Sequence, residues 1–240
     1  DLVLAAVGDE IVAGGSQGIA CGRPGQLHTL AGFAGVQDIV VSDNGLAWIA
    51  CSSGIAVLRP PIANAHPEVV VPPSGAVGRI ASGVGTVWAS SGQDLLEIDP
   101  ETARVRRRLL NAGVEPLLVD RAGRLWVAMG TVGREHRGLG CLRPGGSEVR
   151  TFNTRLTPAN ETFIRGFEDA SGTLWFGTKT SGVLSLRAVD AEVFDTRHGL
   201  PANDTWSVSA SADGGLWVQT MAGPDRKSTR LNSSHEWISR

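Results

Sequence analysis

The chain has 240 residues, of which 42% are hydrophobic and 19% are charged, and this balance is that of a globular protein rather than a disordered one. A formal net charge of −2 gives no electrostatic basis for binding nucleic acid. No run of about 18 apolar residues is present, so we expect no membrane contact by this segment.

Five tryptophans recur along the chain, and each follows a glycine by three positions. A glycine after Asp, Asn or Ser supplies the positive φ that a tight turn between two strands requires. The apolar residues after it are too few for a helix and predict a buried strand. A weaker copy without tryptophan lies at Gly8–Ala13. The pairs are Gly45 and Trp48, Gly85 and Trp88, Gly123 and Trp126, Gly172 and Trp175, and Gly214 and Trp217.

Further strands follow each tryptophan, and no segment has the sustained 3.6-residue periodicity of a helix. A period near 40 residues with about four strands per repeat is typical of an all-β fold, the β-propeller of four-stranded blades. A β-sandwich is the alternative, but it does not predict a recurring Gly-x-x-Trp. The next strands are predicted at 18–21, 54–57, 94–97, 138–141 and 182–185, and outer strands at 68–71, 105–109, 148–152 and 192–195.

The repeats predict a partial propeller over residues 1–224, of about five and a half blades. Propellers normally close their ring and so leave no open sheet edge, so we expect a parent with six or seven blades. Asp1 is not an initiating methionine, so we expect more chain before it. The blades are predicted at 1–30, 31–72, 73–110, 111–154 and 155–197, with a half blade at 198–224.

Residues 225–240 differ from the rest of the chain and contain no glycine. The segment Asp225–His235 matches, residue for residue, the translation of a sequencing adapter. We interpret 225–240 as a non-native, adapter-derived tail and exclude it from the fold. A genuine basic tail is the alternative.

Two loops share more than the repeat: Leu156-Thr-Pro-Ala-Asn-Glu-Thr-Phe163, and Gly199-Leu-Pro-Ala-Asn, which runs on to Leu-Trp-Val-Gln-Thr220. Together with Trp175-Phe-Gly-Thr178, they resemble the two-component regulator propeller repeat, although Ala50 and Ala128 stand where that family usually has glycine. The resemblance implies the periplasmic sensor region of a bacterial inner-membrane histidine kinase that is membrane-anchored and dimeric. It further implies that this fragment is not an enzyme and passes a signal to transmembrane and kinase parts outside it.

Candidate ligand-binding residues gather on one predicted face, formed by the loops before the inner strands and the turns between second and third strands. Binding sites on propellers tend to lie on such a face, around the axis. We expect a small molecule, a glycan or a protein partner there. Solvated loops are the alternative, with the asparagines capping their own turns. The candidates are Arg134, Glu135, His136, Arg137, Lys179, Asn160 and Asn203.

No cofactor or metal is expected, because the turn aspartates fall in different blades and no zinc-ligand spacing is present. An enzymatic alternative is a propeller resembling streptogramin lyase, whose chemistry would need a general base such as His28, His136 or His198. The sequence contains no nucleophile elbow or phosphate-binding loop, so no catalytic residue is assigned. A structural protein-interaction propeller is the third possibility.

Other distinctive residues have structural interpretations. The tryptophans are expected to pack blade against blade. Arg106, Arg107 and Arg108 fall on an outer strand, where charge resists pairing at the edge of a sheet. The cysteines are expected to be small buried or half-buried residues. Cys21 and Cys141 occupy the same repeat position three blades apart, which is too far for a disulfide between them.

Overall fold

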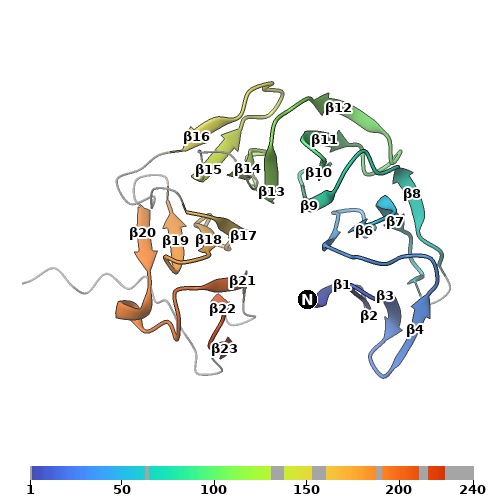
Figure 1. Ribbon diagram of the computed structural model, residues 1–240, viewed down its shortest axis with the longest axis horizontal. Coiled ribbons are helices and arrows are strands. Elements are labelled where there is room, and N and C mark those ends of the chain that lie inside the picture. The colour runs from blue at the N-terminus through green and yellow to red at the C-terminus, as the bar shows by residue number, and fades with distance from the viewer. Residues whose placement is uncertain are drawn as a thin grey trace, which may run out of the picture. The chain divides into compact units, whose positions relative to one another are not determined.

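The computed structural model describes residues 2–62, 65–130, 138–152, 161–187, 191–210 and 216–224. The chain forms two compact units, residues 1–152 and 153–240. In each unit the regular secondary structure of the described chain is almost entirely antiparallel β-sheet, as the repeats predict (Figure 1). Helix is confined, in the described ranges, to short 3-10 turns such as η2 (Thr196–His198). Those ranges include no helix long and apolar enough to cross a membrane.

The first unit contains four four-stranded sheets, and in each the strands pair in chain order. We number them sheet 1 (β1–β4) to sheet 4 (β13–β16). The outer strands predicted at 68–71 and 105–109 are β8 and β12. The strands are β1 (Leu2–Val7), β2 (Glu10–Gly15), β3 (Gly18–Arg23), β4 (Gln26–Leu30), β5 (Asp38–Val41), β6 (Ala47–Cys51), β7 (Gly54–Leu58), β8 (Glu68–Val71), β9 (Val77–Gly83), β10 (Thr86–Ser91), β11 (Asp94–Ile98), β12 (Val105–Leu109), β13 (Val114–Val119), β14 (Leu125–Met129), β15 (Gly138–Leu142) and β16 (Arg150–Phe152).

The second unit contains sheet 5, with four strands, and sheet 6, with three. Over 198–224 the sequence predicts two strands. The structure has both and adds a two-residue third strand, β23, which pairs with β22. The strands are β17 (Phe163–Glu168), β18 (Leu174–Thr178), β19 (Val183–Leu186), β20 (Ala191–Phe194), β21 (Thr205–Ala210), β22 (Leu216–Thr220) and β23 (Gly223–Pro224).

In sheets 4 and 5 the hairpin turn also fixes the tryptophan that follows it. Asp120 accepts hydrogen bonds from the backbone N–H groups of Ala122 and Arg124 within the turn, and its Oδ2 accepts the indole N–H of Trp126 at 2.8 Å. One carboxylate therefore shapes the turn and satisfies a buried donor, which would otherwise carry a desolvation cost. Asp169 and Trp175 repeat the arrangement at 2.8 Å.

The first Gly-x-x-Trp repeat, in sheet 2, uses a hydroxyl in place of this carboxylate. The Trp48 indole N–H donates to Ser42 Oγ at 3.0 Å. Asp43, one residue later, instead accepts a hydrogen bond from the backbone N–H of Gly85 in sheet 3. Asp43 therefore helps to join two sheets, a role that its place in the sequence pattern does not reveal.

Tryptophans pack one sheet on the next, as predicted. In the first unit β5 lies against β1, β9 against β5, and β13 against β9. Trp48 joins a buried cluster with residues of sheet 3, and Trp88 joins one with residues of sheet 4. In the second unit Trp175 packs with residues of sheet 6. Trp217 differs from these three tryptophans, with 44% of its surface exposed.

The arginine run lies on β12, an outer strand of sheet 3, where the sequence predicts it. Each guanidinium pairs with a carboxylate on or beside the neighbouring strand β11. The pairs are Arg106 with Asp99 at 2.8 Å, Arg107 with Glu97 at 2.8 Å and Arg108 with Asp94 at 2.7 Å. The outer strand β12 therefore carries three positive charges, and each of them is paired with a carboxylate. The cysteines are all free, with Cys21 and Cys51 buried and Cys141 half-buried.

Candidate functional site

One end of the sheets in the first unit carries the connections into the first strands and the turns between second and third strands, because adjacent strands run antiparallel. We call this end the loop face. A cavity of about 770 Å³, here named the inner cavity, lies at the loop face of sheets 2 to 4. Its polar side chains are Gln37, Ser52, Ser90, Gln93 and Glu115.

An ion pair between two first strands borders the inner cavity. Arg79 Nε on β9 lies 3.1 Å from Glu115 Oε2 on β13, and the two side chains are 23% and 32% exposed. The backbone N–H of Arg79 donates to Ser90 Oγ at 3.0 Å. The pair is partly withdrawn from water, so each charge is compensated by the other rather than by solvent.

A glycine makes room for these polar groups. A Cβ atom at Gly78 would lie 2.5 Å from Ser90 Oγ and 3.4 Å from Glu115 Oε1. Any larger residue at this position would displace the Ser90 hydroxyl. Because Gly78 has no side chain, its backbone can lie against the side chains of Ser90 and Glu115 at the wall of the cavity.

The carboxylate of Asp38 anchors the strand that follows Gln37. Asp38 is fully buried, its Oδ1 accepts the N–H of Ile39 at 2.9 Å, and its Oδ2 accepts the N–H of Ile80 at 3.0 Å. These bonds tie β5 to β9 and satisfy a charge that would otherwise be costly to bury. The first strands beneath the cavity are thereby held in place.

The chemistry of the inner cavity suits binding through hydrogen bonds. Hydroxyl, amide and carboxylate groups supply donors and acceptors, and the described lining includes no histidine or lysine. Cys51 lines the cavity, but burial raises the pKa of its thiol and only partly offsetting hydrogen bonds from Ser53 and Gly54 lower it. The protonated thiol is a poor nucleophile. Across the described residues, no group of three or more His, Cys, Asp and Glu is placed to hold a metal ion.

The sequence-predicted candidates lie elsewhere in the chain. Five of them fall outside the described residues: Arg134, Glu135, His136, Arg137 and Asn160. The other two, Lys179 and Asn203, belong to the second unit. Their ligand-binding role stays a prediction.

In the second unit, Lys179 and Asn203 belong to neighbouring turns. Lys179 is exposed, and its backbone N–H donates to the carbonyl oxygen of Thr162 at 2.9 Å. Asn203 Oδ1 accepts the N–H of Thr196 at 2.8 Å, and its carbonyl oxygen accepts the N–H of Gly182 at 2.9 Å. Asn203 therefore holds its own loop together, which is the turn-capping alternative noted from the sequence.

Glu161 is a structural residue of the same turns. Its side chain is buried, and its oxygens accept the N–H of Thr162 at 2.8 Å, the hydroxyl of Thr180 at 2.6 Å and the hydroxyl of Ser181. With its hydrogen-bonding capacity used inside the protein, Glu161 has little left for a ligand.

Sequence reasoning missed the residues of the inner cavity. Gln37, Ser52 and Gln93 lie in the loops and turns of the face that it searched, but none of them was singled out, and Ser90 and Glu115 lie on strands β10 and β13. Arg79 and Glu115 lie 36 positions apart in two different repeats, and their pairing arises only when β9 and β13 lie side by side. A charged residue near the start of successive first strands, as at Asp38, Arg79 and Glu115, was the available signal.

No protein-family model matches the chain, and no curated protein matches it. Solved structures do. The extracellular domain of BT3049 from B. thetaiotaomicron, named as a hybrid two-component system, superposes with a TM-score of 0.71 at 17% identity over 90% of this chain. The extracellular domain of BT4673 from the same organism gives 0.69 at 15% identity over 92%. The chain spans only 31% and 33% of those two structures.

An enzyme is also among the similar structures. Virginiamycin B lyase from Staphylococcus aureus superposes with a TM-score of 0.67 at 16% identity, covering 90% of this chain and 76% of the lyase. These similar proteins are β-propellers, and at such identities the likeness concerns the fold alone. The chain is therefore a β-propeller protein built from four-stranded blades, as predicted, and its function requires a separate argument.

Proposed function

We propose that this chain is part of the extracytoplasmic sensor region of a two-component regulator of the histidine-kinase type, with the inner cavity as its ligand site. In this proposal the propeller binds a polar small molecule or a glycan and passes the signal to transmembrane and kinase parts elsewhere in the protein. The region would lie in the periplasm of a bacterial cell. The propeller itself carries out no reaction.

The observation that carries the proposal is the likeness of nine-tenths of the chain to the extracellular domains of BT3049 and BT4673. The Gly-Leu-Pro-Ala-Asn loop and the Leu-Trp-Val-Gln-Thr strand resemble the repeat of the same class. The inner cavity adds a polar, partly enclosed surface at the loop face, where hydroxyl and amide groups match a ligand rich in hydroxyl groups.

The second candidate function is that of a lyase, favoured by the likeness to virginiamycin B lyase. A lyase needs a base within hydrogen-bond reach of the proton that it removes. The Glu115 carboxylate, on the wall of the inner cavity, is already paired with Arg79 through one of its oxygens. The geometry therefore favours binding without turnover.

The test is a thermal-shift screen of the full chain against neutral sugars, oligosaccharides and small metabolites, followed by calorimetry of every compound that stabilises it. A ligand of the inner cavity should bind about tenfold more weakly to Ser90→Ala, which removes a hydroxyl group, or to Glu115→Gln, which replaces the carboxylate acceptor with an amide. Glu68→Gln, at an exposed carboxylate outside the cavity, is the matched control and should leave the affinity unchanged.

Two results would redirect the proposal. Chemical conversion of a bound compound, followed by mass spectrometry, would support the lyase function instead. Full affinity in both cavity variants, with loss in Lys179→Ala, Asn203→Ala or a variant with Arg134 and Arg137 both changed to alanine, would move the ligand site to the sequence-predicted loops.

A further inference from the structure

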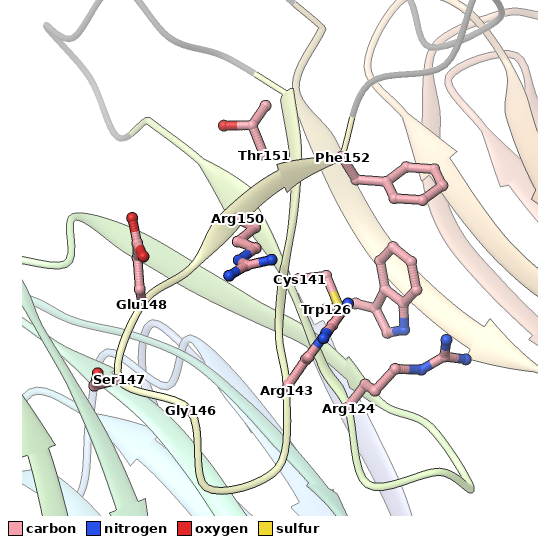
Figure 2. Close-up of a pocket in the computed structure, with 10 residues that line it drawn as sticks. All are labelled: Arg124, Trp126, Cys141, Arg143, Gly146, Ser147, Glu148, Arg150, Thr151 and Phe152. Carbon is pink, nitrogen blue, oxygen red and sulfur yellow. The ribbon is translucent and has the colours of Figure 1, made fainter.

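A second cavity of the first unit lies on sheet 4 and has a volume of about 460 Å³ (Figure 2). We call it the outer cavity. Residues alternate between the two faces of a strand, so side chains two positions apart share a face. The outer cavity is formed on one such face by Trp126 of β14 and Arg124 just before that strand, by Cys141 of β15 and Arg143 just after it, and by Arg150 and Phe152 of β16.

The preceding repeat contains an equivalent row of directly paired residues, Trp88 on β10, Glu97 on β11 and Arg107 on β12. The Arg107 guanidinium lies over the Trp88 ring, 5.2 Å from its centroid, and Arg107 Nη2 lies 2.8 Å from Glu97 Oε2. In sheet 3 the arginine of the row, Arg107, is therefore paired with a carboxylate of the same row, that of Glu97.

In sheet 4 the corresponding row is Trp126, Cys141 and Arg150, so a thiol stands where Glu97 supplies a carboxylate. Burial raises the pKa of the Cys141 thiol, so that side chain carries no negative charge near neutral pH. Neither Arg150 nor Arg143 makes a side-chain hydrogen bond or ion pair with the part of the chain that the structure describes. Figure 2 shows both guanidinium groups directed toward the region around Cys141.

The remaining charges of the outer cavity do not compensate these two arginines. Arg124 is engaged by Asp120, with its Nε 2.6 Å from Oδ2. Glu148 is the single carboxylate among the lining residues, is exposed, and stands apart from the two guanidinium groups in Figure 2. The row in sheet 4 thus lacks the negative charge that Glu97 supplies to the row in sheet 3.

We propose that the outer cavity binds a small organic carboxylate between Arg143 and Arg150, in the place that the Glu97 carboxylate holds in sheet 3. The planar guanidinium fork matches a carboxylate with two parallel hydrogen bonds. Phe152 is half-buried and packs edge-to-face on Trp126, with ring centroids 5.1 Å apart. These rings form an apolar wall for the body of the ligand. The site is separate from the inner cavity and does not depend on the function proposed for it.

Benzoate is a suitable probe, because it joins a carboxylate to a flat apolar ring. We expect saturable binding to the full chain by calorimetry, with a change in the indole N–H resonance of Trp126. Arg143→Gln and Arg150→Gln should each weaken benzoate binding about tenfold or more. Arg23→Gln removes an exposed arginine on sheet 1 and should leave the affinity unchanged. Benzamide, which has the same ring without the charge, should not bind.

A second variant tests the comparison between repeats. Cys141→Glu restores the row found in sheet 3, and its carboxylate should pair with Arg150 and abolish benzoate binding. Cys141→Ser supplies no charge and should keep it. The proposal is overturned by unchanged affinity in both arginine variants, by equal binding of benzamide, or by the absence of saturable binding to the unaltered chain.

Discussion

The guanidinium of Arg107 lies over the indole ring of Trp88, with Cζ 5.2 Å from the ring centroid. The same guanidinium reaches Glu97 Oε2 at 2.8 Å and donates from Nη1 to the carbonyl oxygen of Gly146 at 2.6 Å. Gly146 lies in the turn between β15 and β16, so Arg107 joins the outer strand of sheet 3 to sheet 4. One side chain on an edge strand therefore contributes to the packing of two sheets.

Arg107→Ala should lower the free energy of unfolding by about 2 kcal/mol, because it removes the cation–π contact with Trp88 and the hydrogen bonds that the charged guanidinium donates. Arg107→Lys should recover only part of this loss, since an ammonium cannot replace the planar fork. Urea unfolding followed by tryptophan fluorescence measures both.

The adjacent Arg106 provides the control. Its side chain is 45% exposed and its ion pair is with Asp99, so Arg106→Ala should cost no more than about 0.5 kcal/mol. Equal losses from Arg106→Ala and Arg107→Ala would contradict the bridging role of Arg107.

Gly177 in β18 allows sheets 5 and 6 to approach. A Cβ atom there would lie 2.8 Å from Thr205 Oγ1 and 2.9 Å from Val208 Cγ2. The Thr205 hydroxyl donates to the carbonyl oxygen of Thr178 at 2.7 Å, so displacing it breaks a buried hydrogen bond. Gly177→Ala should destabilise the chain by about 1–3 kcal/mol, as overpacked sites do.

The matched substitution is Ala50→Gly, at the same repeat position of sheet 2, where the methyl group is fully buried in a packed cluster. It should also destabilise, by about 1 kcal/mol, through lost packing and greater chain entropy. Thermal unfolding compares the two. If Gly177→Ala leaves the melting temperature unchanged, sheet 6 can move away from the added methyl group without loss of stability, which would contradict this prediction.

Asp195 predicts a pH dependence in the second unit. Hydrogen bonds from the Arg197 side chain, followed by those from the Arg197 backbone and His198, lower the pKa of Asp195 from 3.8 to about 2. Since the pKa is lower in the folded state, the charged carboxylate stabilises the fold above about pH 4, and this stabilisation is lost as the pH falls toward 2. Asp195→Asn should therefore lower the melting temperature at pH 7, and the difference from the unaltered chain should shrink below pH 4. A difference that stays constant from pH 7 to pH 3 would contradict this.

Much of the fold could be predicted from the sequence because its repeat is local. The glycine before each tryptophan marks a turn, and the strands on both sides of it follow within a few residues. The outer strands at 68–71 and 105–109 agree with β8 and β12 to the residue. Trp217 was predicted to be buried like the others and is exposed, because burial depends on a neighbouring sheet and not on the repeat itself.

The candidate sites were less predictable for a related reason. The sequence directed attention to charged loops, whereas the two cavities of the first unit are lined largely by strand residues and short turns. The arginine run on β12 was interpreted as protection of a sheet edge, and its ion pairs were not predicted, because the acidic partners on and beside β11 become its neighbours only through strand register.

The sequence by itself determined the repeat, its hairpin turns and the all-β fold, because positive φ at glycine and short apolar runs act over a few residues. Only the tertiary structure decided that Arg79 meets Glu115, that Arg107 covers Trp88, and that Arg150 faces a thiol where the previous repeat has a carboxylate. Such pairs depend on which strands lie side by side and in which register. Those relationships arise from the packing of whole sheets, to which residues far apart in the chain contribute together.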